Sequence, residues 1–299
     1  MQSLTASSIK QSVIAVPPLA RDADLTFNRE ENQRIVSYIE SGGVTTLLYG
    51  GNAVFYHIAP SRYAQLLQML SELASSQTIM IPSVGPAYGM MMDQAKVLND
   101  FDFTTAMVLP QKEISTSSGI ARAVRDFCES AQLPAVLYIK HDNYLEVADA
   151  ARLMNDGLLS AIKYAIVRED ASNDDYLRDL VEAVGPDLIV SGMGEQPAIV
   201  HMRQFGLAGF TSGCVCIRPD LSAQMLTAVH SDDVNLAESI RETFRPLEDL
   251  RNRINPIRVL HEAVALAGIA KTGPLIPCLS DLEPSERELV ADAANKLLH

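Results

Sequence analysis

The sequence of 299 residues lacks most of the short patterns that assign a cofactor or a metal directly. None of its four cysteines forms a Cys-x-x-Cys pair, and its six histidines show no His-Glu-x-x-His spacing, so we expect no metal site. It also has no Gly-x-Gly-x-x-Gly turn and no P-loop lysine, which argues against the two common nucleotide-binding loops. No apolar run reaches the roughly 18 residues of a membrane span, and the start lacks the layout of a secretion signal.

Basic side chains are also scarce, with 24 Lys and Arg against 37 Asp and Glu, for a net charge of −13. A field of this sign repels a phosphate backbone, so we expect neither a nucleic-acid partner nor a membrane partner. Without a secretion signal or paired cysteines, a reducing cytoplasmic location is expected. Only seven of the basic residues are lysines, so each lysine can be considered individually.

What the sequence does contain is a regular alternation of short apolar runs with segments of helical period. The runs are rich in Val, Ile and Thr and are apolar on both faces, which is typical of parallel strands covered on both sides. Eight such units predict an α/β fold, a closed (β/α)8 or TIM barrel, with an open doubly wound sheet as the alternative. The runs are Ser12–Leu19, Thr45–Tyr49, Thr78–Val84, Thr105–Leu109, Ala135–Ile139, Ala161–Val167, Leu188–Val190 and Ala208–Thr211.

The last part of the chain has a different pattern. We expect residues 1–231 to form the barrel and residues 232–299 to form a C-terminal helical extension packed on it. The expected helices of the extension are Asn235–Arg253, Ile257–Ala267 and Pro284–Leu298. The extension could cap the barrel or provide a surface for oligomerisation.

Reactive groups of a barrel enzyme lie at the C-terminal ends of its strands, and Lys163 is the most informative residue there. It interrupts the apolar run Leu158–Val167, and a buried ammonium tends to lose its proton, which makes the amine a nucleophile for carbonyls. The alternative is a lysine that extends to solvent from a strand end. Tyr138, on the preceding strand, could move protons beside such a lysine or could be an ordinary core tyrosine.

Further polar groups follow other predicted strands. Lys140 shares the face of Tyr138 and could bind a substrate carboxylate, or it could be an exposed loop charge. Two turns, one of Gly50, Gly51 and Asn52 and one of Ser191 and Gly192, offer donors that could bind a carboxylate, although tight turns use glycine anyway.

Taken together, these positions resemble the dihydrodipicolinate synthase/N-acetylneuraminate lyase family, over nearly the whole chain. The resemblance implies a TIM barrel in which Lys163 forms a Schiff base and Tyr138 shuttles protons. The segments that carry the resemblance are Val13–Pro18, the loop Gly50–Val54 in place of a Gly-Thr-Thr-Gly-Glu-like sequence, Tyr138, Ala161-Ile162-Lys163, Ser191-Gly192, and Asn255-Pro256 with Gly273-Pro274 in the tail.

The chain departs from this pattern in several places. Asn52 replaces the loop hydroxyl that binds the keto-acid carboxylate, and Val54 replaces the acidic residue. Gln111 stands near the position of an aromatic residue that the synthases offer to a neighbouring subunit. The segment 139–143 lacks the arginine that holds a second carboxylate. Dihydrodipicolinate synthase itself is therefore not expected, and the Gly-Gly pair before Phe55 looks closer to the 5-dehydro-4-deoxyglucarate dehydratase branch.

Two functions remain open from the sequence. The first is a Schiff-base lyase, an aldolase or a dehydratase, acting on a 2-keto acid or a sugar-derived keto acid through Lys163 and Tyr138. Because the iminium is the electron sink, the resemblance implies no metal or organic cofactor, and it implies a homo-oligomer, a dimer or tetramer. The distal end of the substrate would meet Lys140 or His141. The alternative is a non-catalytic barrel that binds a carboxylated metabolite or serves as an oligomeric partner, because Asn52 cannot relay a proton as a hydroxyl can.

Overall fold

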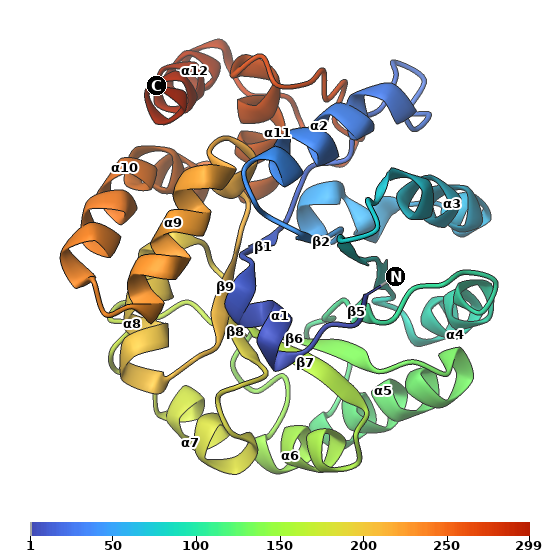
Figure 1. Ribbon diagram of the computed structural model, residues 1–299. Helices are drawn as coiled ribbons and strands as arrows, with labels where there is room; N and C mark the ends of the chain where they lie inside the picture. The colour runs from blue at the N-terminus through green and yellow to red at the C-terminus, as the bar shows by residue number, and fades with distance from the viewer. Residues whose placement is uncertain (1) are drawn as a thin grey trace.

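The computed structural model describes residues 2–299 as a ring of parallel strands surrounded by helices (Figure 1). The strand order is β3-β2-β1-β9-β8-β7-β6-β5-β4. Strands β3 (Ile79–Ile81) and β4 (Ser83–Val84) lie on either side of Pro82, which has no N–H to donate to a neighbouring strand. β3 pairs with β2 (Thr46–Leu48) and β4 pairs with β5 (Ala106–Val108), so the two together occupy one strand position of the barrel. The predicted (β/α)8 barrel is therefore confirmed.

Every residue of the nine strands is buried, as expected when helices cover the outer face and side chains fill the interior. The longest strands, β6 and β7, lie side by side and pair in one continuous register from Val136 and Ala161 onward, after an irregularity at Ser160. The remaining strands are β1 (Ile14–Ala15), β6 (Ala135–Ile139), β7 (Leu159–Tyr164), β8 (Ile189–Ser191) and β9 (Gly209–Ser212).

Helices between the strands form the outer ring. Some of them begin at an N-cap side chain that binds a free N–H group of the first turn. Asn28 accepts a hydrogen bond from the Glu31 N–H, and Asp174 accepts one from the Leu177 N–H. The helices of the ring are α2 (Arg29–Ser41), α3 (Tyr63–Leu73), α4 (Tyr88–Leu98), α5 (Ser117–Ala131), α6 (Val147–Asn155), α7 (Asp175–Val184), α8 (Glu195–Phe205) and α9 (Pro219–His230).

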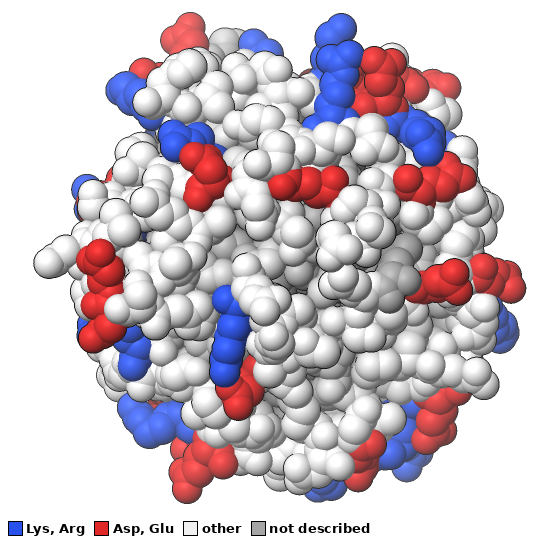
Figure 2. Space-filling view, viewed as in Figure 1, with Lys and Arg blue, Asp and Glu red and all other residues white. Residues whose placement is uncertain are grey.

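A short first helix, α1 (Ala6–Gln11), was not expected from the sequence. It lies in front of the strands at the centre of the ring in Figure 1. Its Ile9 carbonyl oxygen lies so close to Gly209, the first residue of β9, that a Cβ there would be 2.9 Å from it. The helix therefore covers the N-terminal end of the barrel. Figure 2 shows this face, where acidic and basic side chains lie mostly around the rim.

The C-terminal extension, residues 232–299, contains α10 (Val234–Arg253), α11 (Pro256–Leu266) and α12 (Pro284–Leu298). These bounds lie within one residue of the expected ones. Helix α10 packs against α8 and α9, and α11 packs against α12 and the 3-10 turn Gly51–Ala53. Within residues 2–299, no helix has the length and apolar character needed to cross a bilayer.

Candidate active site

Lys163 and Tyr138 are directly opposite one another on β7 and β6. The two strands are parallel and in register, so both side chains point to the same side of the sheet. The Lys163 Nζ lies 4.5 Å from the centre of the Tyr138 ring, and the residues are only 5% and 8% exposed. The sequence analysis named both residues, and the structure brings them into contact near the C-terminal ends of the two strands.

Burial, together with the nearby positive charges of Lys140 and Arg251, lowers the pKa of Lys163 to about 7. Among the described residues, no carboxylate forms an ion pair with Lys163 or Lys140 that would restore the charged form. A lysine with this pKa is about half neutral near pH 7, and only the neutral amine attacks a carbonyl carbon.

Tyr138 shifts in the opposite direction, because burial raises the pKa of its phenol. The phenol therefore keeps its proton at neutral pH beside an amine that readily loses one. Within residues 2–299 neither the phenol nor the amine has a hydrogen-bond partner, yet neither is fully sealed from solvent. Both groups are thus free to bind a substrate.

The predicted carboxylate turn lies at the end of β2, across the barrel mouth from β7. The N–H groups of Ala53 and Phe55 both donate to the Gly50 carbonyl, and in the described chain the N–H groups of Gly51 and Asn52 have no acceptor. The Asn52 side-chain amide donates to the Val16 carbonyl oxygen at 3.0 Å, so it helps to hold the turn itself. The free donors at this turn are therefore on the backbone.

Val54, which follows this turn, has a φ of 51°. A β-branched residue in the left-handed region costs on the order of 1–3 kcal/mol. Val54 is nevertheless only 1% exposed, so burial of its side chain offsets part of that cost.

Ser191 and Gly192 differ in what they contribute. The Ser191 hydroxyl is buried and hydrogen-bonds His201 Nδ1 at 2.8 Å, on the outer side of β8, so it holds α8 in place. At Gly192, a Cβ would lie 2.7 Å from the Tyr164 carbonyl oxygen and 3.0 Å from Lys163 Cγ. Only glycine allows this close approach to the base of the reactive lysine.

The sequence analysis missed that α10 forms part of this wall. Arg251 donates from Nη1 to the Met193 carbonyl oxygen at 3.0 Å, directly after Gly192. Glu248, one turn earlier on α10, accepts hydrogen bonds from the N–H groups of Glu195 and Gln196 at 3.0 and 2.9 Å. No local signal in the sequence separates Arg251 from the other arginines of this helix.

Glu195 and Glu248 form a pair of buried carboxyl groups behind the Met193 loop. Burial raises the pKa of both, and the negative charge of Glu195 raises that of Glu248 further. The hydroxyls of Ser212 and Ser222 also donate to Glu195. Two adjacent carboxyls at such depth retain a proton between them, so they neutralise less of the positive charge of Arg251 and Lys163 than two carboxylates would.

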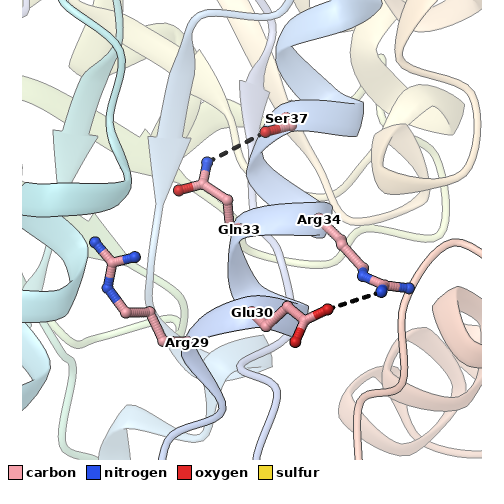
Figure 3. Close-up of a pocket in the computed structure, with 5 residues that line it drawn as sticks. All are labelled: Arg29, Glu30, Gln33, Arg34 and Ser37. Carbon is pink, nitrogen blue, oxygen red and sulfur yellow. Dashed lines mark hydrogen bonds and ion pairs between the residues drawn. The ribbon is translucent and has the colours of Figure 1, made fainter.

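A shallow pocket on the outer face of α2 lacks the buried, unpaired groups of the barrel mouth (Figure 3). Its charged groups are paired, with Arg34 and Glu30 at 2.9 Å, and Gln33 donates to the Ser37 hydroxyl at 3.2 Å. The side chains of Arg34 and Glu30 are 55% and 77% exposed. The pocket therefore offers a ligand no unpaired or desolvated group.

Comparisons with known proteins place the whole chain in one family. Residues 11–297 match the model of the dihydrodipicolinate synthetase family. The chain is 21% identical to a protein of Pseudomonas entomophila named "Probable 5-dehydro-4-deoxyglucarate dehydratase", covering 97% of this chain and 96% of that one. A protein of the same name from Pseudomonas putida is also 21% identical, with 97% of each chain covered.

Solved structures share the fold at low identity. Dihydrodipicolinate synthase of Bacillus clausii has a TM-score of 0.83 at 21% identity, covering 97% of this chain and 98% of that chain. N-acetylneuraminate lyase of Aliivibrio salmonicida has a TM-score of 0.84 at 13% identity, covering 99% and 98%. With the family model matching almost the full length, the chain belongs to the dihydrodipicolinate synthetase family.

Proposed function

We propose that this protein is a Schiff-base lyase that acts on a 2-keto acid, with Lys163 as nucleophile and Tyr138 as proton shuttle. The observation that carries the proposal is the buried amine of Lys163 in contact with the Tyr138 ring, without a carboxylate partner. The family match and the names of the relatives indicate a lyase-type enzyme, and those names favour dehydration of a sugar-derived keto acid.

The chemistry follows from the two shifted groups. The neutral Lys163 amine attacks the ketone carbon, Tyr138 donates a proton to the carbinolamine oxygen, and water leaves to give an iminium. The Tyr138 phenolate then takes the proton from the adjacent carbon, which forms an enamine. The enamine expels the hydroxyl of the next carbon, which takes that proton back from Tyr138 and leaves as water, so the result is dehydration. In an aldolase, the iminium instead accepts electrons from the breaking carbon–carbon bond.

Substrate orientation in this proposal comes from the backbone. The N–H groups of Gly51 and Asn52 bind the carboxylate beside the ketone, and Gly50 allows the turn to lie close to the interior, where a Cβ would meet Met107 Cε at 2.6 Å. Backbone donors in a turn stabilise an anion without a formal charge. Gly192 keeps Lys163 in place from the side of β8.

Borohydride trapping tests the proposal. Incubation with pyruvate or a deoxy keto acid and then borohydride should add the mass of the reduced adduct to Lys163. Lys163→Ala should show no adduct, whereas Lys112→Ala is the matched control, since that lysine is 62% exposed and lies beside Glu113. If wild-type protein forms no adduct with any keto acid, the non-catalytic binding barrel is favoured instead.

We also expect a homo-oligomer and a cytoplasmic location. A groove near the barrel mouth, of about 1060 Å³, is flanked by Tyr88 and Ile114, whose side chains are 52% and 72% exposed. Exposed apolar groups gathered beside a groove are typical of an interaction surface. Light scattering on the purified protein measures the oligomeric state, and a monomer at all concentrations contradicts this expectation.

A further inference from the structure

The barrel mouth gathers positive charge in a protein whose net charge is −13. Lys163 lies in β7, and Lys140 directly follows the neighbouring strand β6. Arg251, on α10, contacts the loop after β8. The strands β6 and β8 flank β7 on its two sides, so Lys140 and Arg251 lie on either side of Lys163. A carboxylate bound at Gly51 lies across the mouth from these charges, of which only Arg251 has a carboxyl group, that of Glu248, within ion-pair distance among the described residues.

Arg251 has donors to spare. Its Nη1 contacts the Met193 carbonyl oxygen at 3.0 Å and lies 3.6 Å from Glu248 Oε1, and in the described chain its Nε and Nη2 have no acceptor. The side chain is 17% exposed and is therefore held in place rather than free in solvent. A guanidinium held in place through one N–H group can still donate two parallel hydrogen bonds from its remaining N–H groups to a carboxylate.

We propose that Arg251, with Lys140, binds a second carboxylate at the end of the substrate far from the ketone, and so selects keto diacids over keto monoacids. This inference rests on the proposed function and names Arg251 as the residue that determines its specificity for keto diacids. The arginine comes from the C-terminal extension, so the extension completes the substrate site. It also replaces the second-carboxylate arginine that segment 139–143 lacks.

Two probes of equal chain length test this. 2-Oxoadipate and 2-oxohexanoate differ in the distal carboxylate, and the half-saturating concentration of each is measured by borohydride trapping. We expect wild-type protein to favour 2-oxoadipate by about tenfold or more, as charge-assisted hydrogen bonds imply. Arg251→Met should bring the ratio close to one, and Lys140→Met should lower it in part.

The ratio is the appropriate readout because loss of Arg251 also removes a positive charge near Lys163. That raises the pKa of the amine and slows trapping of both acids alike. Arg253→Met is the matched control, since Arg253 is an exposed arginine two residues further along the same helix, and it should keep the wild-type ratio. If Arg251→Met does not fold, Arg251→Lys and Lys140→Met decide by the same ratio.

An unchanged ratio in both the Arg251 and Lys140 variants overturns the proposal. If wild-type protein traps neither acid, the Schiff-base function fails, but calorimetric titration with the same two acids still decides this inference. Preferential binding of 2-oxoadipate that disappears in Arg251→Met supports it, and equal binding of the two acids overturns it.

Discussion

The barrel mouth and the outer face of α2 both carry basic side chains, but these side chains differ in burial and in pairing with carboxylates. On α2, Arg34 and Arg29 each contact a glutamate at 2.9 Å and are more than half exposed. Such exposed pairs are worth about 0–1 kcal/mol. At the mouth, Lys163 is buried without an ion-pair partner among the described residues, which destabilises the fold. The proposed function assigns the reaction to this unpaired amine and none to the paired arginines of α2.

Removing one cation from each region tests this difference with the largest expected effect. Lys163→Met should lower turnover of a keto-acid substrate by about 10⁴-fold or more, because it removes the amine that the proposed mechanism uses to form the iminium. Arg34→Met should leave turnover within about twofold, since its pair with Glu30 lies on the surface. Steady-state kinetics on both variants measures this, and comparable losses in the two would contradict the contrast.

Tyr138→Phe tests whether the phenol proton matters or only the ring. The ring contact with Lys163 remains in this variant, so only proton transfer is lost, and turnover should fall by about 10²-fold or more. The hydroxyl has no partner among the described residues, so the free energy of unfolding should change by less than about 1 kcal/mol. A variant with unchanged turnover would assign Tyr138 to packing alone.

The destabilising effect of Lys163 should depend on pH. Burial lowers its pKa from 10.5 to about 7, so between these values the unfolded chain binds more protons and stability rises with pH. Lys163→Met lacks this term and should exceed wild type by a few kcal/mol near pH 7, with the gap closing toward pH 10. Urea unfolding at several pH values measures it. A gap that does not change with pH would mean that the amine is not desolvated.

The smallest expected effects compare two glycines of the mouth. Gly192→Ala places a Cβ 2.7 Å from the Tyr164 carbonyl oxygen and should cost about 1–3 kcal/mol while displacing Lys163. At Gly51 a Cβ would meet only Tyr56 Cε2, at 3.8 Å, so Gly51→Ala should change stability by about 0.5 kcal/mol or less. Thermal unfolding of the two variants separates a packing glycine from one that only provides its N–H.

Local sequence was informative where an element is defined by its own residues. The periodicity predicted α12 and β6 with the bounds that the structure has. It did not predict α1, whose Ser-rich sequence has a single buried apolar residue, Ile9, and so carries almost no helical stripe. Nor did it show that Pro82 splits one strand of the ring in two.

For the candidate site, the sequence predicted the pair Lys163 and Tyr138, because a lysine within an apolar strand stands out from its neighbours, and in the structure the two side chains are in contact. The folded chain was needed to see that Ser191 faces His201, that the Asn52 amide is bound to Val16, and that Arg251 reaches the mouth. The physical reason is that each contact joins two different elements. Ser191 meets His201 when α8 packs on β8, Asn52 meets Val16 when β1 and β2 pair, and Arg251 meets Met193 when the C-terminal helix α10 packs on the barrel. The pattern within one element does not record which side chain of another element it meets.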